Sequence, residues 1–338
     1  MKQSKIILIV TAVIMAVALP CCRTEKPFHR YEGFIWGTTF HITYASNVNL
    51  DDSIMAVMQH VDDVLSPFNT ASLVSRINNN ETAQTDELFR AVFRCSQDIN
   101  RISDGAYDPT LGPVIDLWGF GPAGLRTKTP TSEQLDSALM SVGIADCALD
   151  STGILIKKSP STRFDFSSIA KGFGCDLVAD LLSRNGVENY IVEIGGEVVV
   201  KGKSPRNAPW RVMVDAPIGE NDTIVHDGIA VVKLTEGALA TSGDYRNFHI
   251  MDDGVNATHI INPATGMPAH SEILSVTILA PDCMVADALA TACSVLSVDS
   301  AKAMIDTIEN VEALFVTRDS LNEKWVITAT DAFPEMSR

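Results

Sequence analysis

The chain has 338 residues, of which 46% are hydrophobic and 20% are charged, as is usual for soluble globular proteins. Its formal net charge of -16 argues against nucleic acid as a partner, because binding phosphates requires clustered Lys and Arg. Single cores stop growing at roughly 250 to 300 residues, so the length fits one large domain or two modest ones.

The N-terminus has the composition of an export signal. Lys2 and Lys5 precede an apolar run from Ile6 to Leu19, which is shorter than the about 20 apolar residues that a membrane span needs. We therefore expect residues 1–21 to be a lipoprotein signal peptide. Cys21 and Cys22 follow Pro20, and we expect Cys22 to carry a lipid on the periplasmic side of the bacterial inner membrane. An uncleaved anchor is the alternative, and it would leave the domain on the same side.

After this signal we expect a tether over residues 22–33 and a domain over residues 34–330. Five cysteines follow the signal, and their odd number and the absence of any CxxC spacing argue against a disulfide framework and a zinc site. We expect most of them to be small buried apolar residues. They are Cys95, Cys147, Cys175, Cys283 and Cys293.

The first elements of the domain follow from local patterns. Aromatic and β-branched residues predict a strand over Phe34 to Tyr44, in which Gly37 allows a close backbone approach. Apolar residues at helical spacing predict helices over Asp51 to Leu65 and Asp86 to Ile102.

Residues 105–122 contain seven Gly or Pro positions in eighteen, together with several apolar side chains. We expect a structured, partly buried loop without a regular element. Asp108 in this loop is either a functional carboxylate or an Asx-turn residue before Pro109. A helix over residues 131–142 should follow, capped by Thr131 or Ser132.

A second stretch, Asp165 to Gly174, leads into an amphipathic helix. Serines and small residues at a helix N-terminus expose free N–H groups and the positive end of the dipole, so an anion such as phosphate is favoured there, helped by Lys171. Residues 190–200 then predict a strand with a Gly-Gly interruption. Glu193 and Glu197 beside it are either functional or solvent-facing.

The stretch from Ala240 to Pro268 is the richest in polar and turn-forming residues. We predict a turn at Thr241-Ser242-Gly243-Asp244 and a hairpin turn at Asp252-Asp253-Gly254, with His259 on the second strand of that hairpin. A ligand site and an ordinary hairpin with polar turns are both compatible with this segment.

A helix over Asp282 to Val298 carries Asp287 and Thr291 on one face, four residues apart. A carboxylate and a hydroxyl in that arrangement can reach one cation, and oxygen ligands suit Mg²⁺ or Ca²⁺ rather than zinc. A further helix is expected over Asp299 to Glu309. The remaining predicted strands are 210–214, 229–234, 275–280, 312–316 and 324–328.

Six blocks occur in order and resemble the ApbE family of FAD:protein FMN transferases. They are GAYDPTLGP with LWGFG, DFSSIAKGF, EIGGE, ALATSGDY, THIINPATGMP and ADALATA. The resemblance covers nearly the whole mature chain. It implies a mixed α/β (α+β) fold, with a single domain of two packed subdomains and the flavin site between them.

What the resemblance implies is a Mg²⁺-dependent enzyme that takes FAD, transfers FMN to a Thr or Ser hydroxyl of an acceptor flavoprotein subunit and releases AMP. The metal would lie between Asp287, Thr291 and the backbone carbonyl of Ala170. The FAD pocket would comprise Trp36, Phe68, Ala106, Tyr107, Asp108, Ser167, Lys171, Phe173, His259 and Ile260. Trp36 stands where such proteins often have Met.

The catalytic parts implied are Lys171, which would hold the phosphates, and a base for the acceptor hydroxyl. His259 is the first choice for this base and Asp244 the alternative. Two other functions remain open at this point. One is a metal-dependent FAD pyrophosphatase, in which water replaces the acceptor, and the other is a periplasmic FAD-binding lipoprotein without turnover.

Overall fold

The computed structural model describes residues 26–215, 219–220, 223–224, 228–243, 248–269, 271–318 and 325–337. The predicted signal peptide, the lipidation site Cys22 and the alternative base Asp244 lie outside the described residues. Within the described part, no helix combines the length and the apolar character that crossing a membrane requires.

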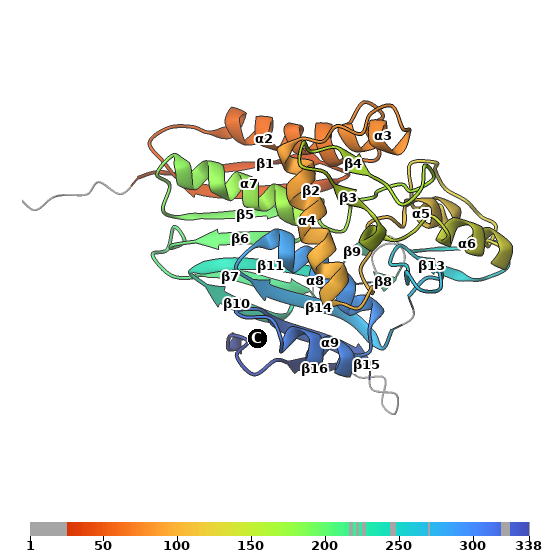
Figure 1. The fold of residues 1–338 in the computed structure, drawn as a ribbon. Helices are drawn as coiled ribbons and strands as arrows, with labels where there is room; N and C mark the ends of the chain where they lie inside the picture. Colours follow the sequence, from red (N-terminus) through yellow and green to blue (C-terminus); the bar gives the residue numbers. More distant parts are fainter. Residues whose placement is uncertain are drawn as a thin grey trace, which may run out of the picture.

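A large antiparallel sheet organises the molecule (Figure 1). In the described residues it has eight strands in the order β1-β2-β5-β6-β11-β14-β15-β16. Hairpins join β1 to β2 and β5 to β6, whereas β11 and β14 are neighbours that lie far apart in the chain. The strands are β1 (Phe28–Ile35), β2 (Thr38–Ala45), β5 (Tyr190–Ile194), β6 (Glu197–Lys201), β11 (Glu236–Gly243), β14 (Ile273–Ala280), β15 (Glu312–Arg318) and β16 (Trp325–Ala329).

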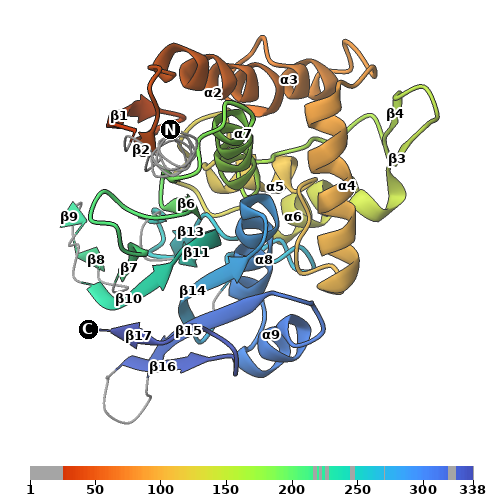
Figure 2. The same cartoon turned by 90° about the vertical axis from the view of Figure 1, so that its left-hand side faces the viewer.

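The two faces of this sheet are covered differently. Figure 2 shows α8 and α9 on one side, whereas β7 and β10 lie on the other. On the side of α8 and α9, α2 packs on α7 and α4 packs on α8, so this side of the sheet is the thicker one. The helices are α2 (Asp51–Leu65), α4 (Glu87–Ile102), α7 (Ala170–Arg184), α8 (Cys283–Val295) and α9 (Val298–Ile305). The covering sheet consists of β7 (Trp210–Asp215), β10 (Gly228–Leu234) and β17 (Met336–Ser337).

Shorter elements complete the chain. In Figure 1, α5 and α6 lie to the right of the sheet, close to β13. The strands β12 and β13 form the predicted hairpin around residues 252–254, but His259 comes just after β13 rather than within it. These elements are α3 (Leu73–Asn78), α5 (Gly112–Trp118), α6 (Ser132–Leu139), η1 (Ile144–Asp146), β3 (Ala148–Leu149), β4 (Leu155–Ile156), β8 (Gly219–Glu220), β9 (Thr223–Ile224), β12 (Phe248–Ile250) and β13 (Asn256–Thr258).

Several local predictions are confirmed. The helix α2 has the predicted bounds, and Asp86 caps α4 by accepting a hydrogen bond from the N–H of Phe89. Thr131 caps α6 in a capping box with Gln134. All five cysteines of the described part are free thiols, and Cys95 alone among them is not fully buried. The mixed α+β composition is confirmed as well.

The predicted single strand at the start of the domain is wrong. A hairpin turn at Trp36 and Gly37 separates β1 from β2, and β1 begins at Phe28, inside the expected tether. Gly37 has φ +76°, and a Cβ there would meet no atom within 4 Å. Gly37 therefore serves the left-handed backbone of the turn and not a close approach.

The prediction that residues 105–122 contain no regular element is also wrong, because α5 occupies Gly112–Trp118. Pro113 lies in the first turn, where its missing N–H costs nothing, and Gly119 ends the helix with φ +81°. The Gly and Pro residues thus mark the two ends of the helix instead of preventing it.

Three more predictions differ from the structure in their boundaries. Thr241, Ser242 and Gly243 are the end of β11 and not a turn. The helix expected over residues 282–298 ends at Val295, because Ser297 accepts a hydrogen bond from the N–H of Ser300 and starts α9 there. α9 ends at Ile305, four residues before the predicted end.

Candidate functional site

A cavity of about 770 Å³ opens where the N-terminus of α7, the strands β6 and β11 and the helix α8 meet. Its other walls come from the loops around residues 66–69, 106–111 and 259–261. This volume lies in the range of pockets that bind small molecules and cofactors.

The close packing of α7 on α8 creates the charged floor of this cavity. A Cβ at Gly172 would lie 2.3 Å from the carbonyl oxygen of Cys283, so only glycine permits this approach. The N–H of Gly172 donates to Oδ2 of Asp287 at 2.9 Å. Asp287 is only 3% exposed, and this hydrogen bond fixes the orientation of its carboxylate.

Lys171 lies between two buried carboxylates. Its Nζ is 2.9 Å from Oε1 of Glu197 and 3.7 Å from Oδ1 of Asp287. Although burial disfavours the ammonium, the two carboxylates raise the pKa of Lys171 above its ordinary value. Burial raises the pKa of Glu197 to about 7, against the opposing effect of Lys171. With all three groups ionised, the cluster has one negative charge in excess.

The oxygen atoms around this cluster suit a hard divalent cation. Ala170, Asp287 and Thr291 all line the cavity, and Oγ1 of Thr291 is 3.4 Å from Oγ of Ser242. Oε2 of Glu197 is buried and has no hydrogen-bond partner. Carboxylate, hydroxyl and carbonyl oxygens are ligands of Mg²⁺ and Ca²⁺, and the excess negative charge also favours a cation. No group of three or more His, Cys, Asp or Glu residues in the described chain could hold a metal.

Several of the N–H groups predicted to be free at the start of α7 already donate hydrogen bonds. The N–H of Ala170 donates to the carbonyl of Phe166, that of Gly172 to Asp287, and that of Phe173 to Ile169. The expectation that a phosphate binds at this helix start therefore does not hold for these three N–H groups. Attraction of an anion to this part of the cavity depends on the ammonium of Lys171.

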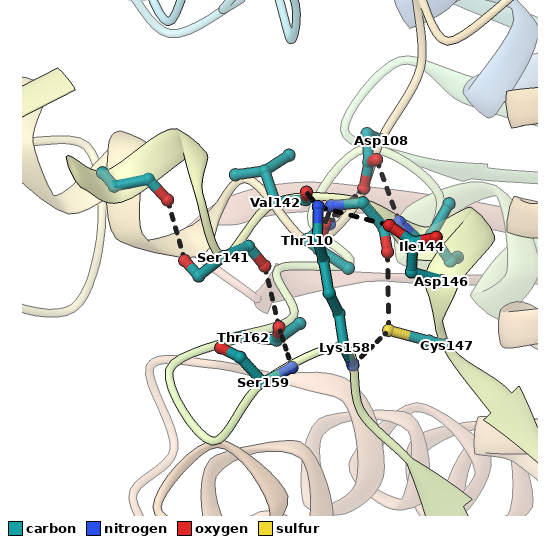
Figure 3. A network of polar contacts seen from close by, with 12 residues as sticks. Asp108, Thr110, Ser141, Val142, Ile144, Asp146, Cys147, Lys158, Ser159 and Thr162 are labelled. Carbon is teal, nitrogen blue, oxygen red and sulfur yellow. Dashed lines mark hydrogen bonds and ion pairs between the residues drawn. The ribbon is translucent and has the colours of Figure 1, made fainter. Parts of the chain in front are cut away.

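Asp108 belongs to a hydrogen-bonded network that includes Thr110 and Ile144 (Figure 3). Its Oδ1 accepts from N and Oγ1 of Thr110 at 2.8 and 2.6 Å, and its Oδ2 accepts from the N–H of Ile144 at 3.0 Å. Burial raises the pKa of this carboxyl, and these hydrogen bonds oppose the shift. Lys158 ties the same segment down through the carbonyl of Val142 at 2.8 Å. The Asx-turn interpretation of Asp108 is thus confirmed, although the residue also lines the cavity.

Aromatic side chains form one wall of the cavity. Tyr107 is buried, whereas Phe68 is 58% exposed at the opening. Trp36 packs so tightly against α7 that a Cβ at Gly174 would lie 2.3 Å from its ring. The ring of Phe120 is 6.4 Å from that of His259, and both residues line the cavity. Such a wall suits a flat aromatic ligand.

Comparison with known proteins supplies the family. The profile described as "ApbE family" matches residues 36–315. The chain belongs to the ApbE family. It is 35% identical to the "FAD:protein FMN transferase" of Haemophilus influenzae, with 99% of each chain covered. It is 34% identical to the protein of the same name from Vibrio cholerae, over 91% of this chain and 93% of the relative.

Solved structures agree. "Flavin Transferase ApbE from Vibrio cholerae" superposes with a TM-score of 0.81 at 32% identity, covering 91% of this chain and 98% of the other. The apo form of the Pseudomonas stutzeri flavinyl transferase ApbE superposes with a TM-score of 0.79 at 30% identity, covering 92% and 97%. The resemblance to the ApbE family that the six sequence blocks indicated is therefore confirmed.

The structure of this ApbE-family chain brings most of the predicted site residues together on the cavity. They are Trp36, Phe68, Ala106, Tyr107, Asp108, Ser167, Ala170, Lys171, His259, Ile260, Asp287 and Thr291. Phe173 is the exception, because it is buried in the core against other apolar residues. It lies two residues after Lys171, which is about 200° around an α-helix, so it faces the opposite way.

Glu197 is the main residue for which the sequence did not decide between a functional and a solvent-facing role. Glu193 and Glu197 flank one hairpin turn, yet Glu193 binds His41 at 2.6 Å on the surface while Glu197 is 3% exposed in the cavity. A signal was present, since Glu197 begins a strand whose next three residues are all buried valines. A carboxylate in such a strand needs a partner.

Proposed function

We propose that this ApbE-family protein transfers FMN from FAD to a Thr or Ser hydroxyl of an acceptor protein and releases AMP. The observation that carries the proposal is one cavity of about 770 Å³ that combines an aromatic wall, a lysine paired with buried carboxylates and a set of oxygen ligands. It occurs in a chain that is 35% identical over its whole length to a protein named FAD:protein FMN transferase.

The flavin ring and the diphosphate of FAD each have suitable surroundings in this cavity. Trp36, Phe68 and Tyr107 would bind the flavin ring by stacking and apolar contact. Lys171 would bind the diphosphate, because its raised pKa keeps it charged at neutral pH. This charge matters in a chain whose net charge of -16 would otherwise repel an anion.

Asp287, Thr291 and the carbonyl of Ala170 would hold a Mg²⁺ ion. When bound there, the ion would neutralise the diphosphate and stabilise the charge that develops on the departing AMP. The residues themselves orient the reacting groups, since the N–H of Gly172 fixes the carboxylate of Asp287 and the ion pair with Glu197 at 2.9 Å fixes the ammonium of Lys171.

The transfer forms one bond and breaks one. The acceptor hydroxyl oxygen bonds to the phosphorus of the FMN half, the bond from that phosphorus to the bridging oxygen breaks, and AMP leaves with that oxygen. The hydroxyl proton passes to a base. His259 on the cavity wall is the first candidate for this base, and Asp244 is the second.

One assay tests the proposal. The domain without its signal peptide is incubated with FAD, Mg²⁺ and a candidate acceptor protein, and flavin fluorescence is read in a denaturing gel. A fluorescent acceptor band that is lost with EDTA and with a Thr→Ala acceptor is the expected result. Free FMN without labelled acceptor would replace the transferase by a FAD pyrophosphatase, and unchanged FAD would indicate a binding protein without turnover.

We also propose that residues 1–21 are removed and that Cys22 carries a lipid that holds the domain on the periplasmic side of the inner membrane. The motif that supports this is the charged start, the apolar run and the Cys21-Cys22 pair. Cell fractionation tests it: Cys22→Ser should move the protein from the membrane to the soluble fraction. Cys21→Ser is the matched control and should leave it in the membrane.

A further inference from the structure

Glu197 is the nearer of the two buried carboxylates that flank Lys171, and the proposed function assigns it no part in binding the cation. It is 3% exposed, and one of its oxygens binds Lys171 Nζ at 2.9 Å while the other has no partner. Leaving a carboxylate in this position is costly unless it does something that a neutral residue could not.

The backbone holds Glu197 firmly in place. It pairs with Ile194 across the β5–β6 hairpin, and its carbonyl accepts a hydrogen bond from Sγ of Cys175 on α7 at 3.3 Å. The turn of this hairpin also confines Lys171, because a Cβ at Gly195 would lie 3.3 Å from Cδ of that lysine. The stem of Lys171 therefore runs along the turn toward Glu197.

The distances show which carboxylate forms a hydrogen bond with the ammonium of Lys171. Nζ of Lys171 is within hydrogen-bond distance of Glu197 and, at 3.7 Å, beyond it from Oδ1 of Asp287. Oδ2 of Asp287 is occupied by the N–H of Gly172. Oδ1 of Asp287 is thus the oxygen available to a cation, and an ammonium bonded to it would compete for the same position.

We infer that Glu197 is a positioning residue, which holds the ammonium of Lys171 off Asp287 and so keeps Oδ1 of Asp287 available to a divalent cation. The inference rests on the cation site of the proposed function. Glu197 acts through Lys171 and is not itself a ligand.

The test is calorimetric titration of the FAD-free protein with Mg²⁺, which needs no turnover. Partners that orient a metal ligand typically change metal affinity by about 10- to 100-fold, and we expect a loss of that size for Glu197→Gln and for Glu197→Asp. Aspartate keeps the charge but is one methylene too short to hold Lys171. Glu193→Gln removes the same charge from the same hairpin outside the cavity, and it should bind Mg²⁺ as the wild type does.

A second background separates positioning from direct ligation. With Lys171→Met there is no ammonium to restrain, so adding Glu197→Asp should leave the Mg²⁺ affinity unchanged. An equal loss in both backgrounds would make Glu197 a ligand and overturn the inference. Wild-type affinity in Glu197→Asp would overturn it too, because charge alone would then suffice.

A crystal structure of Glu197→Gln gives an independent readout. The expected result is Lys171 Nζ bonded to Oδ1 of Asp287, at about 3 Å or less. A lysine that remains at its present distance would contradict the inference. Failure of the wild-type protein to bind Mg²⁺ would remove the cation site itself, which is a different outcome from altered affinity in the Glu197 variants alone.

Discussion

Two sides of the cavity contain buried or partly buried carboxylates, and they differ in how the carboxylate oxygens are used. On the loop side, both oxygens of Asp108 accept hydrogen bonds from Thr110 and Ile144. On the floor, Asp287 has one oxygen bonded to Gly172, and Glu197 has one oxygen without any partner. The loop carboxylate is saturated by the protein and the floor carboxylates are not.

The difference distinguishes a carboxylate that stabilises the fold from carboxylates that can take part in binding or catalysis. Buried polar groups are almost always hydrogen-bonded, so a saturated carboxylate needs nothing further and stabilises its loop. A buried carboxylate with unused oxygens is retained at a cost, and at Asp287 a bound cation can recover that cost. The same contrast appears within one hairpin, where Glu193 binds Gly196 and His41 and Glu197 faces the cavity.

Asp287→Ala tests the floor. It removes the proposed cation ligand, so flavin transfer should fall by about 10³-fold or more, which corresponds to several kcal/mol of lost transition-state stabilisation. The gel fluorescence assay measures this, and circular dichroism checks that the variant is folded. Retained transfer would mean that the unsaturated carboxylate has no catalytic part.

Asp108→Ala tests the loop. It leaves the N–H groups of Thr110 and Ile144 without their acceptor, so the free energy of unfolding should fall by roughly 2 to 4 kcal/mol. Urea denaturation measures the loss, and Asp108→Asn should lose less because its amide oxygen still accepts. Turnover per folded molecule should fall less than about tenfold. A stable Asp108→Ala protein without turnover would reverse the assignment of the two sides.

Asp176 lies between these two cases, because it is hydrogen-bonded like Asp108 and yet has a raised pKa like Glu197. Stability measured over a series of pH values tests this. Burial raises its pKa to about 7, although it accepts hydrogen bonds from the N–H groups of Met284 and Cys283. The folded protein therefore keeps a proton that the unfolded chain has lost, and stability should decrease as pH rises from about 4 to 7. Glu197 acts in the same direction over a similar window.

Thermal melting without cations should show this decrease, and Asp176→Asn should reduce it by about 1 to 3 kcal/mol because the amide does not ionise. Asp180→Asn is the control on the same helix, since Asp180 forms an exposed pair with Arg184. A pH dependence that is identical in Asp176→Asn and the wild type would show that this carboxylate ionises normally.

The smallest effect is expected for Phe173→Leu. Phe173 packs in the core, so the substitution should cost about 1 to 2 kcal/mol of stability and leave the KM for FAD within about twofold of wild type. Trp36→Leu on the cavity wall should instead raise that KM. A raised KM in Phe173→Leu would restore Phe173 to the flavin site.

Much of the secondary structure could be predicted because its causes are local. Apolar spacing defined α2, and side-chain caps at Asp86 and Thr131 started α4 and α6. Prediction failed where one residue type serves two purposes. Gly and Pro mark the ends of α5 as well as loops, and Thr241 to Gly243 form a strand whose neighbours β6 and β14 are remote in the chain.

The sequence by itself determined the family, the helices that carry Lys171 and Asp287, and the kinds of atoms available for binding. Only the tertiary structure decided which of those atoms remain unused. Asp287 meets Gly172 across 115 residues of chain, and Lys171 meets Glu197 because a hairpin turn packs against its stem. Partners so distant in sequence leave no local pattern, and it is the pairing of charges inside a shared core that distinguishes a structural carboxylate from one that can bind a ligand.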